Sequence, residues 1–174
     1  LWDDQKQKKI AEVSLNSKVI SLYVSDGPHF IVSSYRKVYI YDIDTLTLIK
    51  SYDVCSFSLE TKIFTDDFIL CHVSLRPNNE GSIVIRSKNK YFSIDAHGSS
   101  IGKLSVSNNG KYIATSSING QVIKLFKIDN GDLVTEFRRG TFAKVISYLG
   151  FSDNDNYLLC GTNSGSIHVF NIQQ

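Results

Sequence analysis

The fold is decided by a stretch of sequence that occurs twice, first at residues 107–115 (SNNGKYIAT) and again at residues 152–160 (SDNDNYLLC). Each copy reads as a polar turn followed by a strand, because Tyr, Ile, Leu and Thr come after a cluster of Ser, Asn, Asp and Gly. A second turn follows each copy, at residues 117–120 (SING) and 163–165 (NSG). Asn-Gly and Ser-Gly supply the positive φ that tight hairpins need, so both stretches predict consecutive antiparallel hairpins.

The same pattern returns along the whole chain. Short runs that read as third strands cover residues 38–42, 83–85, 123–127 and 167–171, and residues 1–3 (LWD) look like the tail of an earlier copy. The spacings are 39, 44, 41 and 44 residues when the copies are aligned on Trp2, Tyr41, Ile85, Phe126 and Phe170. This is about the repeat length of a four-stranded propeller blade. The sequence therefore predicts an all-β fold, a WD40-like β-propeller with about four blades.

We expect one partial propeller over residues 1–174. Its segments are the end of one blade (1–9), three blades (10–52, 53–95 and 96–137) and a partial blade (138–174). A circular propeller closes only when its first and last blades meet, so the truncated first blade predicts that this chain alone does not form a closed ring. The sequence contains no Met, which is consistent with an excerpt of a longer protein.

Composition argues against several classes of protein. The net charge of +2 is too small to indicate a nucleic-acid-binding domain. Cys55, Cys71 and Cys160 show no Cys-x-x-Cys spacing, so a reducing compartment is the simplest inference. No apolar run approaches the roughly 20 residues that span a bilayer, and the N-terminus lacks the order of a signal peptide. We expect a cytoplasmic protein that contacts membranes only peripherally.

No catalytic motif is found in the sequence, which lacks a Gly-x-Ser-x-Gly elbow, a P-loop and a His-Glu-x-x-His pair. Asp66 and Asp67 fall at the start of a predicted strand rather than in a convergent pocket. Asp153 and Asp155 resemble part of a calcium loop, but the Gly and terminal Glu of such a loop are missing, which favours a hairpin turn. We expect a protein that is not an enzyme and that holds no cofactor and no metal.

The most informative segment is residues 133–141 (LVTEFRRGT), which by repeat position is the outer strand of one blade running into the next. Adjacent residues of a strand point to opposite faces, so Arg138 and Arg139 are expected to serve separate anion sites on the two sides of the strand. Gly140 is expected to let the chain turn there without a Cβ clash.

This segment resembles the signature of the PROPPIN family of phosphoinositide-binding β-propellers, Phe-Arg-Arg-Gly, which is present intact at residues 137–140. Residues 1–4 (LWDD), 37–41 (KVYIY) and 96–97 (AH) resemble other parts of the family's blades, so the resemblance covers the whole chain. It implies a seven-bladed ring of which this chain covers the end of blade 2 to blade 6. It also implies peripheral binding to phagophore or endosomal membranes and recruitment of autophagy-type protein partners.

The resemblance further implies two pockets for phosphatidylinositol 3-phosphate or the 3,5-bisphosphate. Carried over residue by residue, the pockets flank the Phe-Arg-Arg-Gly motif, whose Gly140 is counted among the headgroup-binding residues. The first pocket uses Arg138, His97, Thr115 and Ser117, and the second uses Arg139, Thr162, Ser166 and His168. The residue types suit the ligand, because Arg offers a planar charged fork, Ser and Thr donate hydroxyl hydrogen bonds, and His adds a donor.

The sequence also departs from the family pattern near the first pocket. Gln121 and Lys124 stand where a small hydroxyl residue and an Arg are common, and Gly98 replaces an acidic residue after the histidine. Lys124 keeps the charge but not the bidentate geometry of Arg. We therefore expect the first pocket to bind more weakly than the second. The membrane-inserting loop of the family would follow Ile172 and is absent from this chain.

A protein-binding WD40-like scaffold without lipid binding is the alternative reading. Two arginines in an outer strand also serve to discourage strand pairing, and hydroxyl residues and histidines beside hairpins have structural uses. The two readings differ in their response to replacing the Phe-Arg-Arg-Gly string by Phe-Thr-Thr-Gly. A scaffold would be indifferent to this change, whereas a lipid-binding protein would leave the membrane.

Overall fold

The computed structural model describes residues 2–3, 5, 7–9, 12–24, 27–63, 68–74, 80–87 and 89–173, with the backbone alone at 2–3, 8–9 and 55–63. Every regular element in this part of the chain is a β-strand. In chain order the strands are β1 (Trp2–Asp3), β2 (Lys8–Lys9), β3 (Val19–Val24), β4 (His29–Ser34), β5 (Lys37–Asp42), β6 (Leu48–Asp53), β7 (Cys55–Ile63), β8 (Phe68–Val73), β9 (Ser82–Arg86), β10 (Tyr91–Asp95), β11 (Ile101–Val106), β12 (Tyr112–Ser117), β13 (Val122–Lys127), β14 (Leu133–Arg138), β15 (Ile146–Phe151), β16 (Tyr157–Thr162) and β17 (Ile167–Asn171).

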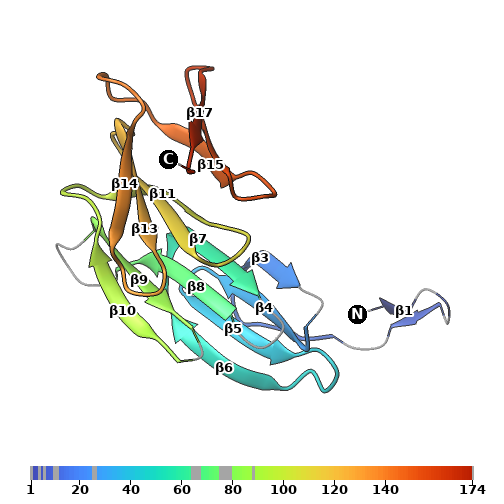
Figure 1. Ribbon diagram of the computed structural model, residues 1–174. Coiled ribbons are helices and arrows are strands. Elements are labelled where there is room, and N and C mark those ends of the chain that lie inside the picture. The colour runs from blue at the N-terminus through green and yellow to red at the C-terminus, as the bar shows by residue number, and fades with distance from the viewer. Residues whose placement is uncertain are drawn as a thin grey trace.

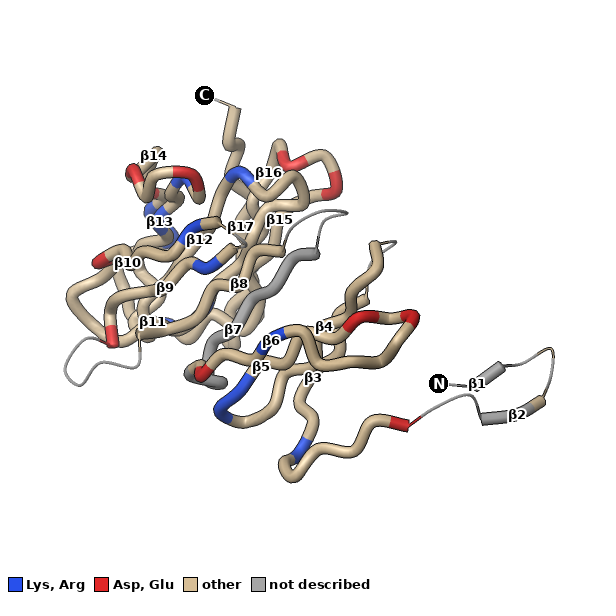
Figure 2. Tube along the Cα trace, turned by 90° about the horizontal axis from the view of Figure 1, so that it is seen from below, with Lys and Arg blue, Asp and Glu red and all other residues tan. Residues whose placement is uncertain are grey.

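The strands form consecutive antiparallel sheets (Figure 1). β3–β6, β7–β10 and β11–β14 are four-stranded, β15–β17 is three-stranded, and β1 pairs with β2. The first strands of successive sheets contact each other, β3 with β7, β7 with β11 and β11 with β15. Figures 1 and 2 show the sheets fanning out from these strands as an open arc. The predicted all-β arrangement of antiparallel blades is confirmed.

Three of the residues used to align the repeat occupy equivalent ladder positions. Tyr41, Phe126 and Phe170 lie on the third strands β5, β13 and β17, and each pairs with the second residue of the preceding strand. The alignment was wrong at Ile85. Leu70 in β8 and Ile113 in β12 both face the preceding blade, so they occupy equivalent positions. Leu70 pairs with Arg86, not with Ile85. Arg86 is therefore the equivalent of the aromatic residues.

Arg86 replaces an aromatic ring in a contact between blades. In the last pair of blades, Phe137 stacks on Phe170 with ring centroids 4.9 Å apart. One blade pair earlier, the guanidinium carbon of Arg86 lies 5.2 Å from the centroid of Tyr52, and it lies 4.2 Å from that of Tyr91 in its own sheet. A guanidinium over an aromatic face gains cation–π energy in addition to the packing of its stem. Because the repeat was aligned on the aliphatic residue Ile85, the sequence did not indicate that an arginine replaces the aromatic residue of this blade.

Replacing Arg86 by alanine is expected to lower the free energy of unfolding by about 1–2 kcal/mol, because the contacts with both rings are lost. Urea denaturation followed by tyrosine fluorescence measures this change. Arg36→Ala is the matched control, since Arg36 lies 5.8 Å from the Tyr35 ring with both residues exposed. Its removal should cost less than about 0.5 kcal/mol. Equal losses in the two variants would contradict the role of Arg86 between the blades.

The core lies between neighbouring blades. Ile113 of β12 belongs to a buried cluster with residues of β7–β10, whereas Ala114, the next residue, belongs to a cluster with residues of β15–β17. A third cluster joins β3–β6 to Leu70 of β8. Each blade therefore has a preceding-blade face and a following-blade face, and successive residues of a strand alternate between them.

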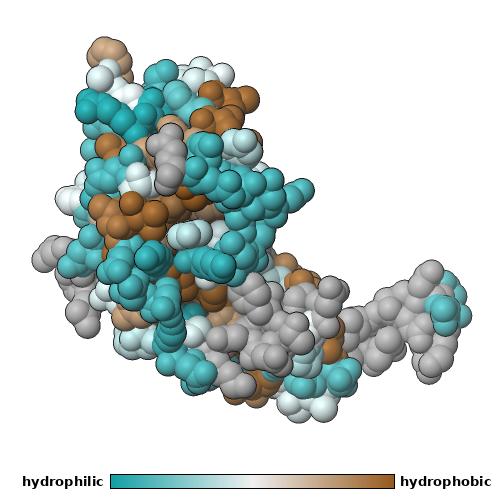
Figure 3. Space-filling view, in the orientation of Figure 1, coloured by the Kyte–Doolittle hydropathy of each residue, from teal (hydrophilic) through white to brown (hydrophobic). Residues whose placement is uncertain are grey.

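Apolar side chains remain exposed on the sheets at the two ends of the arc. Leu22 and Val24 of β3 are 59% and 60% exposed, and Ile167 and Val169 of β17 are 76% and 60% exposed. Figure 3 shows exposed hydrophobic patches on the face of the molecule seen in Figure 1. Residues two apart in a strand share a face, so β3 and β17 each expose apolar side chains on one face, which is typical of a sheet that packs against another element.

Candidate functional site

Arg138 is the last residue of β14, the outer strand of its blade, and Arg139 directly follows the strand. Glu136 pairs with Lys124 across the ladder, and Phe137 stacks on Phe170 of the following blade. Because side chains alternate along a strand, Arg138 shares the preceding-blade face with Glu136, and Arg139 continues the following-blade face of Phe137. The two guanidinium groups leave the chain on opposite sides, in keeping with the alternation expected from the sequence.

The two arginines have different surroundings. Arg138 is exposed, and its guanidinium forms no hydrogen bond or ion pair with another described residue. Arg139 is only 8% exposed, and it donates hydrogen bonds from Nε to the Gly120 carbonyl at 2.8 Å and from Nη2 to the Phe142 carbonyl at 2.6 Å. The other three N–H groups of its guanidinium have no acceptor in the described part of the chain. Two backbone carbonyls thus fix the guanidinium of Arg139, and its other N–H groups can donate to a ligand.

The predicted first pocket lies on the preceding-blade face of β11–β14. His97, which follows β10 of the preceding blade, has its Nε2 3.0 Å from Oγ1 of Thr115. Ser117 lies two residues further along β12 on the same face. Lys124 is opposite Thr115 in the ladder, and Arg138 lies on this face at the end of β14. His97 of one blade and Thr115 of the next therefore lie together on the face that also carries the cations Lys124 and Arg138.

Glu136 is a member of this group that the sequence analysis missed. Its Oε1 lies 3.1 Å from Nζ of Lys124, so the carboxylate neutralises one of the two cations. Position alone could have revealed it, because Glu136 is two residues before Arg138 and must share its face. Burial and then the charge of Lys124 lower the pKa of His97, while the contact with Thr115 and the charge of Glu136 oppose this effect. His97 is therefore a neutral hydrogen-bonding group at neutral pH.

The predicted second pocket lies on the preceding-blade face of β15–β17, across from Arg139. Oγ1 of Thr162 is 2.7 Å from Oγ of Ser166 and 3.0 Å from Oγ of Ser164. The backbone N–H of Ser166 also donates to Thr162 Oγ1 at 3.3 Å. The tight hairpin between β16 and β17 thus gathers three hydroxyl groups at the end of the blade where β14 also ends.

His168 stands beside these hydroxyl groups with an unused nitrogen. Its ring is nearly parallel to that of Phe170, with centroids 6.3 Å apart, so the stack of Phe137 on Phe170 also orients the imidazole. The Nε2 atom is buried and has no hydrogen-bond partner among the described residues. A buried polar atom without a partner is uncommon in a folded protein and suggests that a ligand completes it.

Cys160 and Ser116 also face this interface, and the sequence analysis missed both. Cys160 is opposite His168 in the ladder and is fully buried. Burial raises the pKa of its thiol, and the positive charge of Arg139 opposes that effect. Oγ of Ser116, on the following-blade face of β12, is buried without a partner in the described residues. Both residues read as ordinary strand positions in the sequence.

One expectation about the neighbourhood of the motif is wrong. Gly140 does not avoid a clash, because a Cβ placed on it would meet no atom within 4 Å and its φ is not positive. The side-chain amide of Gln121 donates a hydrogen bond to the Thr141 carbonyl. Its own carbonyl accepts the N–H of Arg139 at 2.8 Å and that of Gly140 at 3.4 Å. Gln121 therefore fixes the path of the chain after β14.

Other candidate features of the sequence were also located. No group of three His, Cys, Asp or Glu side chains in the described residues could hold a metal ion. Asp66 and Asp67 lie outside the described residues. No helix long and apolar enough to cross a bilayer occurs in the part of the chain that the structure describes.

Several curated relatives of the chain are named as autophagy-related proteins of fungi and a plant. The chain is 24% identical over 210 residues to autophagy-related protein 18 of Debaryomyces hansenii, covering 97% of this chain and 37% of that protein. It is 28% identical over 144 residues to autophagy-related protein 18b of Arabidopsis thaliana, covering 79% and 39% of the two chains. The chain thus spans less than half the length of these relatives.

Solved structures share the fold. Kluyveromyces lactis Hsv2 superimposes with a TM-score of 0.86 at 24% identity, covering 99% of this chain and 55% of that one. A complex of KlAtg21 with the coiled-coil of AgAtg16 matches with a TM-score of 0.77 at 25% identity, covering 99% and 58%. The family model named PROPPIN matches residues 1–174, which is the whole chain. The chain belongs to the PROPPIN family.

Proposed function

We propose that this protein binds phosphoinositide headgroups, either phosphatidylinositol 3-phosphate or the 3,5-bisphosphate, in two pockets on either side of the β11–β14 blade. Through these pockets it docks peripherally on phagophore or endosomal membranes and recruits partner proteins to them. The observation that supports the proposal is that Arg138 and Arg139 belong to opposite faces at the end of β14. On each side the interface between blades also holds a histidine and hydroxyl groups.

The chemistry of each group suits a phosphate monoester. Arg138 and Arg139 would donate charge-assisted hydrogen bonds, and Ser117, Thr115, Thr162 and Ser166 would add hydroxyl donors. His97 and His168 would contribute ring nitrogens from the facing positions. Each pocket binds one headgroup, and two sites on one surface strengthen membrane attachment because the second contact is intramolecular.

The two pockets are proposed to differ in strength. The first contains the Lys124–Glu136 ion pair, which lowers its net positive charge. In the second, Arg139 forms no ion pair with a described residue, and its guanidinium is held by two backbone carbonyls before a ligand arrives. A donor held in place loses less entropy on binding. The second pocket should therefore bind more tightly.

Vesicle flotation tests the proposal directly. The purified protein should float with vesicles that contain phosphatidylinositol 3-phosphate and should stay behind with vesicles in which phosphatidylserine supplies the same total charge. The ionic strength must be held constant, because exposed charges are screened by salt. Equal flotation with both vesicles would show unspecific charge attraction. No flotation with either would leave a protein-binding scaffold, and the coiled-coil complex of KlAtg21 shows that a structural neighbour binds a protein.

Replacing Glu136 by glutamine is expected to strengthen the first pocket about fivefold, because Lys124 is released from an ion pair that is partly exposed. The change is best measured in an Arg139→Ala background, where the second pocket is weakened. Calorimetry with soluble inositol 1,3-bisphosphate then reports the first pocket. Glu12→Gln, at an exposed site before β3, is the control and should leave the affinity unchanged. A fall in affinity for Glu136→Gln would contradict this role of Glu136.

A further inference from the structure

A groove with a positively charged rim lies between the β7–β10 and β11–β14 blades, and neither pocket uses it. Its volume is about 380 Å³. Ile69, Tyr112 and Ile128 form an apolar lining, and Lys90, Lys111 and Lys127 stand at its rim. We call this feature the basic groove.

The basic groove lies far from Arg138 and Arg139 along the blade. Tyr112 begins β12 and Lys127 ends β13, and the two residues pair with each other. Ser117 and Val122, at the other ends of these strands, lie beside the proposed lipid pockets. The full length of the two strands therefore separates the groove from the arginines.

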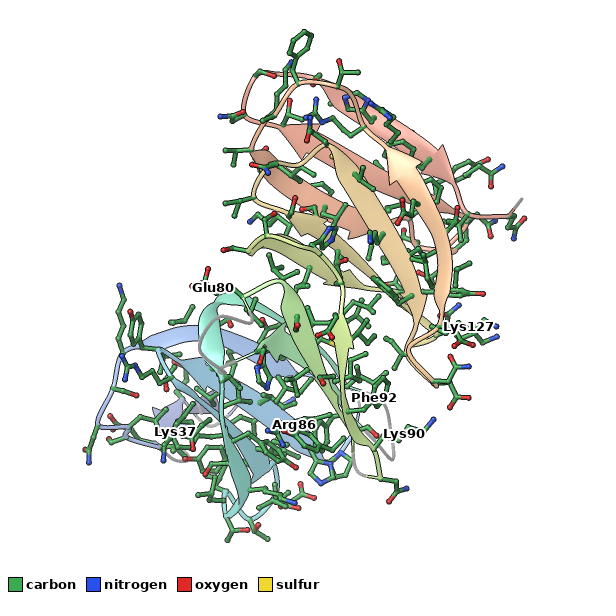
Figure 4. All side chains as sticks on the ribbon, turned by 90° about the vertical axis from the view of Figure 1, so that its left-hand side faces the viewer. Lys37, Glu80, Arg86, Lys90, Phe92 and Lys127 are labelled. Carbon is green, nitrogen blue, oxygen red and sulfur yellow. The ribbon has the colours of Figure 1, made fainter. Side chains whose placement is uncertain are left out.

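The hairpin that forms one wall is fixed against the preceding blade. Gly131 has a φ of +79°, and a Cβ placed on it would lie 3.1 Å from the Phe92 ring and 3.2 Å from Ile94. Gly131 therefore lies directly against β10. Figure 4 shows Lys90, Phe92 and Lys127 gathered at this side of the molecule. The ammonium of Lys90 also forms an ion pair with Asp129 and lies 3.3 Å from its carbonyl oxygen. The groove is thus formed before any partner arrives.

Charges at the rim do not cancel. Asp129 is engaged by Lys90, whereas Lys111 and Lys127 are exposed and form no ion pair with a described residue. Two ammonium groups stand unopposed above an apolar floor that has room for a large side chain. A ligand that fits must combine negative charge with an apolar group.

We infer that the basic groove binds an acidic segment of a partner protein, which places one aliphatic or aromatic side chain between Ile69, Tyr112 and Ile128. Glutamate or aspartate residues that flank this anchor pair with Lys111 and Lys127. An acidic peptide fits better than a membrane surface, because the apolar lining lies between two blades, where a side chain can enter but a flat layer of headgroups contacts only the rim. This inference does not depend on lipid binding by the two pockets.

The test uses two fluorescein-labelled probes in fluorescence anisotropy with the purified protein. One is the peptide Asp-Glu-Leu-Glu-Asp, and the other is Asp-Glu-Gly-Glu-Asp, which has the same charge and no anchor. The first should bind, and the second should bind several-fold more weakly. The double variant Lys111→Glu/Lys127→Glu should weaken the leucine peptide about tenfold or more, since attraction becomes repulsion at both positions. Lys18→Glu/Lys50→Glu carries the same charge change on the first blade and should bind as the wild type does.

Other outcomes overturn the inference. Equal binding of the two peptides would show that the apolar lining is not used. Equal loss in the two double variants would show unspecific attraction. If the Lys111→Glu/Lys127→Glu variant still bound the leucine peptide but no longer bound phosphatidylserine vesicles, the groove would be a membrane-binding site. An Arg138→Ala/Arg139→Ala variant should still bind the leucine peptide. This result distinguishes a failure of the groove proposal from a failure of the lipid proposal.

Discussion

An Arg138→Ala/Arg139→Ala variant is expected to lose its attachment to vesicles that contain phosphatidylinositol 3-phosphate. A hydrogen bond to a charged group contributes roughly 1.5–3 kcal/mol, so each single change should weaken its own pocket about tenfold or more. The double change removes both contacts and the gain from having two sites on one surface. Flotation at one fixed salt concentration measures the loss, and Phe-Thr-Thr-Gly in place of residues 137–140 should reproduce it.

Arg36→Ala is the matched control, because it removes an exposed arginine from the first complete blade, and it should float as the wild type does. A thermal melt of each variant is needed, since Arg139 also donates to the Gly120 and Phe142 carbonyls. Flotation of a folded double variant at the level of the wild type would overturn the lipid proposal and leave the scaffold alternative.

The single variants should not be equivalent. Arg139→Ala should reduce binding more than Arg138→Ala, because Arg138 lies on the face where Glu136 neutralises Lys124. Arg139→Lys separates charge from geometry: it keeps the positive charge but cannot hold both carbonyls and a phosphate with one planar fork. Equal losses from the two alanine variants would remove the difference between the pockets but would keep the lipid proposal.

Local sequence signals were enough to predict the blades. Turn residues at 117–120 and 163–165 encode the hairpins that lead into β13 and β17, and Gly120 and Gly165 adopt the positive φ values that such turns require. Strand alternation was enough to separate the directions of Arg138 and Arg139. Both inferences depend only on neighbours in the chain, which is why they needed no structure.

Contacts across strands and blades could not be predicted in the same way. The Lys124–Glu136 pair depends on the register of β13 against β14, which shifts by one residue between Leu125 and Phe126. The alignment on Ile85 failed because an arginine occupies the aromatic position of that blade. The Nε2 of His168, which has no hydrogen-bond partner among the described residues, is buried. Such features require the positions of residues that are distant in sequence.

The structural role of Asp155 could not be predicted from its neighbours in the sequence. In the sequence it is part of a polar turn that resembles a calcium loop only weakly. In the structure it is 8% exposed with a φ of +57°. Its Oδ1 accepts the backbone N–H of Asn108 at 2.8 Å, and its Oδ2 accepts that of Asn109 at 2.8 Å. These donors belong to the hairpin of the preceding blade, so the carboxylate joins two blades.

Replacing Asp155 by alanine is expected to lower the free energy of unfolding by about 3 kcal/mol, because two charge-assisted hydrogen bonds between blades are lost. Asp155→Asn should cost about half as much, since its amide oxygen still accepts one bond and Asn tolerates a positive φ. Chemical denaturation measures both changes, with the exposed neighbour variant Asp153→Ala as the control. An Asp155→Ala loss no larger than that of Asp153→Ala would show that the two bonds do not hold the blades together. Arg139 and His168 lie between the same two blades. If Asp155→Ala lowers the free energy of unfolding, it should therefore also reduce headgroup binding in the second pocket more than in the first.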